Sequence, residues 1–290
     1  METIGRQTIW TYLAETGAIR PSTNTKIRKA PGRMVRSFLE LTTLVAELQF
    51  KNREHVLLFR GQDKDYLNKA GNSTLKPELF RRIGLSNPGR DKLIPAFEKL
   101  RIKEQALVRC YTDAGFADSK RLTRQQILRW AILQHYRICA TPLLDVTQSL
   151  RVAASFATHG NRSNEGYLFV IGVPNISGAI TASAEAGLQI VRLASACPPT
   201  ALRPHVQQGF LVGEYPDMRS MDQKGQYLAN EIDFGLRLVA KFSFNLTKFW
   251  QGGSFPPVAE VDLYPSPEKD QLAGLAFQIS PDSAGGPRAS

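Results

Sequence analysis

Seven polar residues of this chain have the types needed to bind an anion together with an amide or a hydroxyl group. They are Arg60, Gln62, His135, Tyr136, Asp145, Thr147 and Gln208. An arginine presents a planar fork of N–H donors that matches a phosphate or a carboxylate. Threonine and glutamine can hydrogen-bond a sugar hydroxyl or an amide, and a tyrosine ring can stack on a flat ligand. These residue types favour anion and amide recognition over hydrolysis.

The first of them, Arg60, is expected at the end of a buried strand. Side chains alternate along a strand, so Leu58 and Arg60 share one face while Leu57 and Phe59 share the other. Both faces are apolar as far as Phe59, which is typical of a strand buried on both sides. The arginine stays protonated and needs an anion, either a carboxylate of its own chain or a phosphate from outside.

A structural explanation competes with the binding explanation for several of these residues. Arg60 and Asp145 can satisfy each other as an ion pair without any ligand. His135 continues the apolar stripe of a predicted helix and can be a core histidine. Thr147 and Gln208 can serve as caps or turn residues. The sequence leaves both explanations open.

Capping patterns and periodicity predict helices and strands in comparable amounts. Capping boxes at Ser37 and Thr123 open two helices, the second of which runs to about Ile138, and Ser149 caps a helix through Phe156. Two more helices are expected at 91–111 and 267–277, and strands at 56–60, 167–173, 189–193, 208–212 and 238–244. Strands grouped late in a mixed chain predict the α+β class.

Length and composition favour one soluble domain with extensions. The 290 residues are 42% hydrophobic and 22% charged, without an internal repeat. We expect a basic N-terminal arm in residues 1–36, a domain in 37–279 and a disordered tail, rich in serine, glycine and proline, in 280–290. No secretory signal or bilayer-spanning run is recognisable, which predicts a cytoplasmic protein without membrane contact. Three widely spaced cysteines and four unpaired histidines predict neither disulfides nor a metal site.

The net charge of +11 is partly concentrated near the N-terminus. Six basic residues and no acidic residue lie between Arg20 and Arg36, among prolines, a glycine and small polar residues. Such a segment is expected to be partly flexible and to attract nucleic acid through counterion release. A solvated linker is the alternative. The segment contains no aromatic residue, which weakens a role in stacking on single strands.

The polar residues lie in segments that together resemble the FRG domain, a bacterial and phage family named after its Phe-Arg-Gly motif. The matching segments are Leu57-Leu58-Phe59-Arg60-Gly61-Gln62, Leu75-Lys76-Pro77-Glu78-Leu79-Phe80-Arg81, Leu133-Gln134-His135-Tyr136, Thr141-Pro142-Leu143-Leu144-Asp145-Val146-Thr147, Gln207-Gln208-Gly209-Phe210 and Leu263-Tyr264-Pro265. They follow the order of the family between about Ser37 and Phe277. Arg137 and Val146 depart from the pattern, where the family usually has glycine and often tryptophan.

A second resemblance, in layout, is to ADP-ribosyltransferases, which split nicotinamide from NAD. Those enzymes place an arginine or histidine on an early strand and a Ser/Thr segment before a helix similar to Val152-Ala153-Ala154-Ser155-Phe156-Ala157. Their late strand supplies a glutamate, which stabilises an oxocarbenium-like transition state. Here Gln208 stands about where that glutamate is expected, and glutamine cannot act as a base. Asp145 and Glu214 are the carboxylates that could substitute.

These resemblances imply a cytoplasmic toxin or phage-defence effector with an ADP-ribosyltransferase-like core, NAD as its substrate, and an unknown protein partner or antitoxin. Arg60 would hold a pyrophosphate, Gln62 and Thr147 would bind the cofactor, Tyr136 would stack on a ring, and His135 or Asp145 would orient these groups. Gln208 would contact the ribose near the scissile bond. The alternative is a non-catalytic module that binds nucleic acid or protein, in which the Phe-Arg-Gly motif is structural. The sequence does not decide whether the protein is an enzyme.

Overall fold

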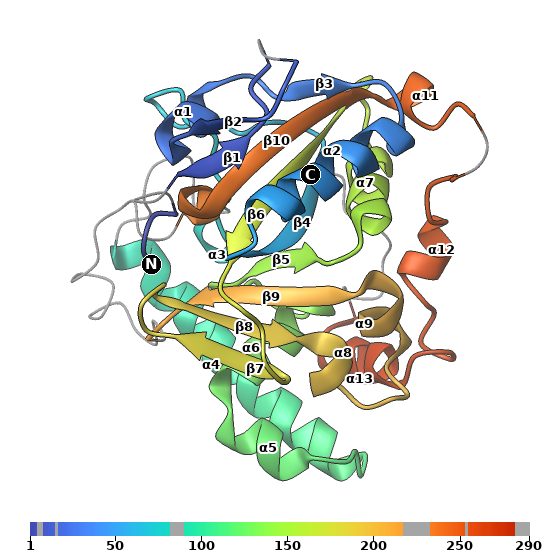
Figure 1. Ribbon diagram of the computed structural model, residues 1–290. Helices are drawn as coiled ribbons and strands as arrows, with labels where there is room; N and C mark the ends of the chain where they lie inside the picture. The colour runs from blue at the N-terminus through green and yellow to red at the C-terminus, as the bar shows by residue number, and fades with distance from the viewer. Residues whose placement is uncertain (5–7, 15–16, 82–89, 217–232, 253–254, 282–290) are drawn as a thin grey trace.

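An eight-stranded sheet forms the frame of the protein (Figure 1). The computed structural model describes residues 1–4, 8–14, 17–81, 90–216, 233–252 and 255–281. The strand order is β3 (Arg33–Val35), β10 (Leu238–Asn245), β6 (Glu165–Val173), β4 (Val56–Gln62), β5 (Leu144–Thr147), β9 (Gly209–Glu214), β8 (Leu188–Arg192) and β7 (Ile180–Ser183). Only β3 and β10 run parallel in this sheet, and β1 (Ile9–Thr11) pairs with β2 (Arg20–Ser22) separately.

The helices pack around this sheet, which confirms the predicted α+β class. Those the structure describes are α1 (Asn24–Lys29), α2 (Phe38–Lys51), α3 (Glu78–Arg81), α4 (Arg90–Asp113), α5 (Ser119–Arg124), α6 (Gln126–His135), α7 (Leu150–Thr158), α8 (Leu193–Ala196), α9 (Leu202–Gln207), α11 (Leu246–Phe249), α12 (Glu260–Leu263) and α13 (Gln271–Ile279), with a 3-10 turn at Phe234–Arg237. None of the described helices is both long and apolar enough to cross a bilayer. The ADP-ribosyltransferase-like core stays a prediction.

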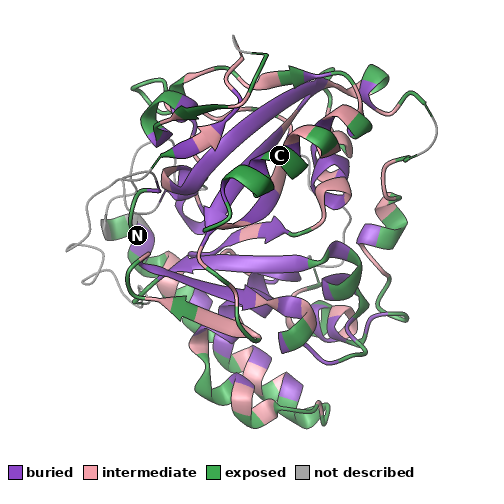
Figure 2. Cartoon of the chain, in the orientation of Figure 1, coloured by how far each residue is buried: buried purple, intermediate pink, exposed green. Residues whose placement is uncertain are grey.

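Two apolar clusters hold the frame together. One joins the central strands β4, β6 and β10 to α2 and α7, and most residues of β6 and β10 are buried (Figure 2). The other joins α4, α6 and α13 to one face of β8 and β9. Leu57, Leu58 and Phe59 are at most 3% exposed, so the predicted strand buried on both faces is confirmed.

Most of the predicted helix starts are confirmed, with one correction. Ser37 caps α2 and Ser149 caps α7 through their hydroxyl oxygens, as expected. The capping box predicted at Thr123 is wrong: Thr123 lies inside α5, where its hydroxyl donates to the carbonyl of Ser119. The chain breaks at Gln125, whose backbone is extended, and α6 begins only at Gln126.

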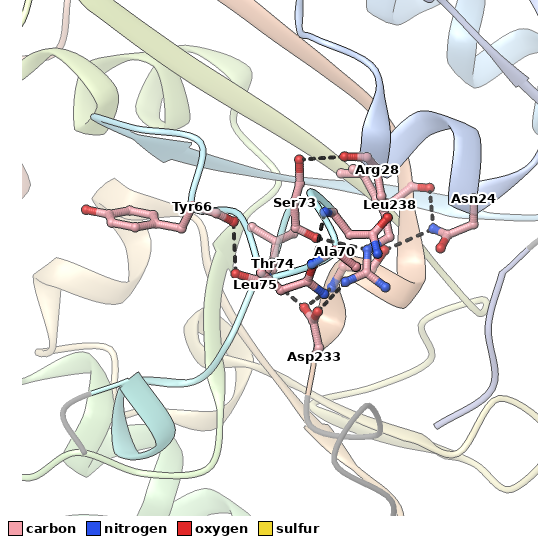
Figure 3. A network of polar contacts seen from close by, with 12 residues as sticks. Asn24, Arg28, Tyr66, Ala70, Ser73, Thr74, Leu75, Asp233 and Leu238 are labelled. Atoms are coloured by element: carbon pink, nitrogen blue, oxygen red, sulfur yellow. Dashed lines mark hydrogen bonds and ion pairs between the residues drawn. The ribbon is translucent and has the colours of Figure 1, made fainter. Parts of the chain in front are cut away.

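Residues 20–36, expected as a basic arm, contribute β2, α1 and β3 to the fold. Strand β3 pairs with β10, and α1 packs on the same strand. Of the basic side chains, Arg28 is buried and ion-paired with Asp233 (Figure 3). Its Nε also donates to the carbonyl of Ser73 at 2.9 Å. The domain boundaries themselves stay a prediction, and the expected tail lies almost entirely outside the described residues.

The Arg28–Asp233 pair is the centre of a buried polar network (Figure 3). Asp233 accepts hydrogen bonds from the backbone N–H groups of Leu75 and Gly235 at 2.8 and 2.9 Å. Beside it, Lys241 forms an ion pair of 2.6 Å with Asp65. This network connects the N-terminal segment to the chain before β10, so its charges stabilise the fold.

Close packing of helix α7 on β4 fixes the strand that carries Arg60. A Cβ atom added to Gly61 would lie 1.8 Å from the carbonyl oxygen of Ala153. This distance is far below any real contact, so only glycine allows the helix to approach the strand. The glycine of the Phe-Arg-Gly segment is therefore a packing requirement.

Replacing Gly61 with alanine should lower the free energy of unfolding by at least about 2 kcal/mol, because the backbone of α7 must move to admit the methyl group. Gly17→Ala is the matched control, since a Cβ at Gly17 meets nothing within 4 Å. Urea unfolding followed by circular dichroism measures both variants. Equal stability of the two would contradict the packing argument.

Replacing Arg28 with alanine should cost about 3–5 kcal/mol, because it leaves the buried carboxylate of Asp233 without its cation. Lys29→Ala, which removes an exposed charge from the next residue, should change stability by less than about 0.5 kcal/mol. Melting temperatures measured by calorimetry would separate the two variants. A mild effect at Arg28 would mean that this segment is dispensable for the fold.

Candidate functional site

A cavity of about 280 Å³ opens where β4, β5 and the start of β9 meet the ends of α6, α7 and α9. Its charged and aromatic walls come from segments far apart in the sequence. The basic side chains are Arg60, Arg81, Arg137, Arg203, His135 and His159, the acidic ones Asp63, Glu78 and Asp145, and the aromatic ones Phe59, Tyr66, Phe156 and Tyr264. Four arginines against three carboxylates leave the described walls with an excess of positive charge, which suits an anionic ligand that carries a ring.

Arg60 lines this cavity as a charged group without a carboxylate partner among the described residues. Its Nη1 donates to the backbone carbonyl of Asp145 at 2.6 Å, and no ion pair links it to a residue in the described part of the chain. Burial, together with nearby Arg81, lowers the pKa of Arg60 to about 10, so it remains protonated at neutral pH. The side chains of Arg60 and Asp145 are thus not directly paired, which weakens the alternative that they form an ion pair. Only the backbone of Asp145 is hydrogen-bonded to the guanidinium group.

The carboxylate of Asp145 is held from its other side by α6. Gln134 Nε2 donates to Asp145 Oδ2 at 2.9 Å, and Nδ1 of His135 lies 3.9 Å from Oδ1. The oxygen of the Gln134 amide accepts from both the backbone and the hydroxyl of Thr141, which fixes the orientation of the amide. Burial opposes ionisation of Asp145, but His135, Arg60 and Gln134 together hold its pKa below the ordinary value. The cavity therefore contains an ionised carboxylate.

His135 is neutral at physiological pH, because burial lowers its pKa although Asp145 favours the charged form. The predicted apolar stripe is confirmed, since His135 is 4% exposed and follows buried Leu128 and Ala131. It is a core histidine that also lines the cavity. The core explanation is therefore confirmed, and the binding role of His135 stays a prediction.

Three buried polar atoms of cavity residues form no hydrogen bond with the described residues. They are Oε1 of Gln62, Nε2 of His135 and Nε of Arg203. Buried donors and acceptors are nearly always paired in folded proteins, because an unpaired one costs about 1–3 kcal/mol. Because these three atoms line the same cavity, a polar ligand bound there could supply their missing partners.

Tyr136, predicted to stack on a ligand ring, does not line the cavity. It is 1% exposed, and its hydroxyl donates to the carboxylate of Asp270 at about 3.0 Å. Asp270 also caps α13 and accepts from the backbone N–H of Arg203. Tyr136 thus joins α6, α9 and α13 and positions the wall of the cavity.

Thr147 and Gln208 have structural contacts rather than the predicted ligand contacts. Thr147 lines the cavity, but its hydroxyl donates to the carbonyl of Gln207 at 2.7 Å and accepts from the N–H of Ser149. Gln208 is exposed and outside the cavity lining, and it ends α9 in the left-handed conformation with φ 46°. The alternative of a turn residue fits Thr147 and Gln208 better. Gln207, the residue before Gln208, lines the cavity instead.

Two cavity residues were missed by sequence reasoning although they lie near recognised segments. Arg81 ends the Leu-Phe-Arg segment, and Tyr264 lies in the Leu-Tyr-Pro segment. The ring of Tyr264 packs against Arg137 and Arg203, whose Cζ atoms lie 4.6 and 4.7 Å from its centroid. Arg203 gave no signal, because an arginine in an amphipathic stretch is ordinarily solvated.

The two carboxylates considered as substitutes for a late-strand glutamate are placed differently. Asp145 lines the cavity, whereas Glu214 lies at the far end of β9, is 9% exposed and is not among the lining residues. Among the described residues, no cluster of three or more histidine, cysteine or acidic side chains is arranged to hold a metal ion. Asp145 is therefore the carboxylate around which any chemistry in this cavity would be organised.

Residues 55–166 match the family model of the FRG domain. An FRG domain is thus present, and it supplies β4, α6, β5 and α7, with Arg60, Gln134, His135 and Asp145 among their residues. The remaining walls of the cavity, including Arg203 and Tyr264, come from outside the matched region. No curated protein and no solved structure matches the chain.

The buried, neutral state of His135 predicts a loss of stability on mild acidification. The unfolded chain takes up a proton near pH 6.5, whereas folded His135 does so only at lower pH. Between these values the unfolded state binds more protons, so the free energy of unfolding falls as the pH falls. His135→Gln should flatten this dependence in the window that starts near pH 6.5 and extends down to the lowered pKa.

Urea unfolding at a series of pH values measures this slope. His55, whose pKa is also lowered by burial, keeps its contribution in the variant, so the slope should be reduced rather than abolished. An unchanged slope in His135→Gln would mean that the pKa of His135 is the same in the folded and unfolded states.

Proposed function

We propose that the FRG domain of this chain binds a nucleotide in the cavity, with NAD as the ligand and substrate of an ADP-ribosyltransferase-like reaction. The observation that carries the proposal is the charged guanidinium of Arg60, which faces a cavity and has only a backbone carbonyl as partner among the described residues. Arginine is the side chain best suited to phosphate, and buried charges are paired in stable sites. The missing partner would be a ligand phosphate.

The roles within the cavity follow from the atoms that remain available. Arg60 would bind a phosphate, and the amide oxygen of Gln62 would accept from a ligand N–H or hydroxyl. Ring contact would come from Phe156 or Tyr264 rather than from Tyr136, because these two line the cavity. A volume of about 280 Å³ suits one nucleotide portion, so the other part of NAD would extend outward.

The chemistry available to Asp145 is stabilisation of positive charge. Its lowered pKa keeps it ionised, which makes it a weak base but a fixed negative charge. Cleavage of the nicotinamide–ribose bond develops positive charge on the ribose, and a carboxylate stabilises it. On this proposal Asp145 takes the part of the absent late-strand glutamate, and the protein acts as a cytoplasmic toxin or defence effector.

A second candidate function is binding of nucleic acid or of an acidic protein partner. It is favoured by the exposure of Arg20, Lys26, Lys29 and Arg36 in a chain with net charge +11. Replacing these four residues with glutamine should abolish salt-dependent retention on heparin if this surface binds nucleic acid. Removing residues 20–36 altogether would be a poor test, because Arg28 is part of the fold.

Arg60→Ala should weaken binding of NAD or ADP-ribose by at least about 100-fold, since a charged hydrogen-bond pair with a phosphate is lost. The melting temperature should change little. Arg162→Ala is the matched control, because Arg162 is exposed and lies just beyond the cavity residues His159, Gly160 and Asn161. Titration calorimetry measures each affinity. Equal affinity of wild type and Arg60→Ala would overturn the proposal, and loss of the fold would return Arg60 to a structural role.

The same samples, followed by mass spectrometry, decide whether binding leads to turnover. Release of nicotinamide that is lost in Asp145→Asn, with NAD binding retained, would assign the charge-stabilising role to Asp145. Binding without release in the wild type would define a recognition domain instead of an enzyme.

A further inference from the structure

Arg203 is buried, with 9% of its surface exposed. Its guanidinium group donates no hydrogen bond to a residue that the structure describes. Its contacts are with rings: the Cζ atom lies 5.5 Å from the centroid of Tyr136 and 4.7 Å from that of Tyr264. The side chain lines the cavity that also contains Arg60. The Nε–H of this cation is buried without an acceptor among the described residues, which is costly for a protein.

The position of Arg203 is nevertheless tightly fixed. Its backbone N–H donates to Oδ2 of Asp270 at 2.8 Å, and the same carboxylate holds the hydroxyl of Tyr136. At the other end of α9, Nε2 of Gln207 donates to the carbonyl of Leu263 at 2.6 Å. Helix α9 is thus anchored at both ends, while the guanidinium group of Arg203 has no hydrogen-bond partner among the described residues. Such preorganisation is typical of binding sites.

Arg203 and Arg60 approach the cavity from different elements, the start of α9 and the end of β4. Both guanidinium groups are within electrostatic reach of Asp145, which favours the charged form of each. Burial, together with Arg137, lowers the pKa of Arg203 to about 10, so both arginines are charged at neutral pH. The four arginines of the cavity outnumber its three carboxylates among the described residues, which leaves room for additional negative charge.

We propose that Arg203 is a second anion-binding residue of the cavity, and that Arg60 and Arg203 together select ligands with two linked phosphates over ligands with one. The inference rests on the proposed function, because it concerns the same cavity, and it assigns recognition of the second phosphate to Arg203. A single phosphate satisfies one guanidinium fork, whereas a diphosphate offers acceptors to both. Discrimination arises because the monophosphate leaves Arg203 buried and unpaired.

Arg203→Met tests this, because methionine keeps the packing between the two tyrosine rings and removes the charge. Without ligand, its melting temperature should equal or exceed that of the wild type, since an unpaired buried charge is removed. A fall of several degrees would assign Arg203 to the fold instead and overturn the inference. Arg203→Lys keeps a cation in place, and Arg162→Met is the control for an exposed arginine.

Affinities for ADP, AMP, inorganic pyrophosphate and inorganic phosphate are measured by calorimetry for wild type and variants. The wild type should prefer ADP over AMP by at least about tenfold, and pyrophosphate over phosphate likewise. In Arg203→Met both preferences should shrink to less than about threefold, with AMP affinity nearly unchanged, whereas Arg162→Met should behave as wild type. Arg203→Lys should retain part of the preference.

The possible failures are distinguishable. If ADP and AMP bind the wild type equally, or if Arg203→Met keeps the preference, the inference is overturned while nucleotide binding stands. If pyrophosphate binds with the stated dependence on Arg203 but no nucleotide binds, the diphosphate site stands and the proposed nucleotide function falls. If none of the four ligands binds, both are overturned.

Discussion

A charged arginine at the end of a strand buried on both faces is the constraint on which the candidate site depends. Strand β4 cannot shift, because Gly61 lies directly under the backbone of α7 and Leu58 is fully buried. Arg60 is therefore held in one position, where its guanidinium group donates to a backbone carbonyl and lines the cavity. The surrounding elements are arranged to keep that place polar. Gln134 fixes Asp145, and Asp270 fixes the segment that carries Arg203.

The structure uses its buried charges in two different ways. In the network around Arg28, Asp233, Lys241 and Asp65, each cation has a carboxylate, so these charges satisfy one another and join distant segments. Around the cavity, Arg60 and Arg203 have no carboxylate at ion-pair distance among the described residues, and a glutamine and a histidine atom are unpaired as well. The first arrangement is typical of a structural core. The second reduces stability and is expected where a ligand completes the contacts.

Sequence reasoning predicted the local elements well because their signals are local. Continuous apolar runs marked β4 and β6, and serine caps marked α2 and α7. It also grouped Arg60, Gln62, His135 and Asp145, which the fold brings together around one cavity. The FRG match over residues 55–166 covers these four residues and the earlier segments that suggested the family, whereas the segments at 207–210 and 263–265 lie outside it.

The errors came from positions where burial and direction are set by tertiary packing. Tyr136 follows His135 in the sequence but points to Asp270, and Gln208 follows Gln207 but ends α9 outside the cavity. Neighbouring residues on a turn can face opposite surroundings, and no periodicity predicts which one faces a ligand. The basic segment 20–36 was read from its charge, although one arginine in it is a core residue. Arg203 could not be recognised, because its partners Tyr136, Tyr264 and Asp270 are distant in the sequence.

The central claim is that the cavity beside Arg60 binds a nucleotide phosphate. A crystal structure of the protein soaked with NAD or ADP-ribose tests it most directly. If the cavity binds a nucleotide, phosphate oxygens lie within hydrogen-bond distance of the Arg60 guanidinium and the ligand fills the cavity lined by His135 and Asp145. A ligand bound only elsewhere on the surface, with Arg60 still held by the Asp145 carbonyl alone, would contradict it.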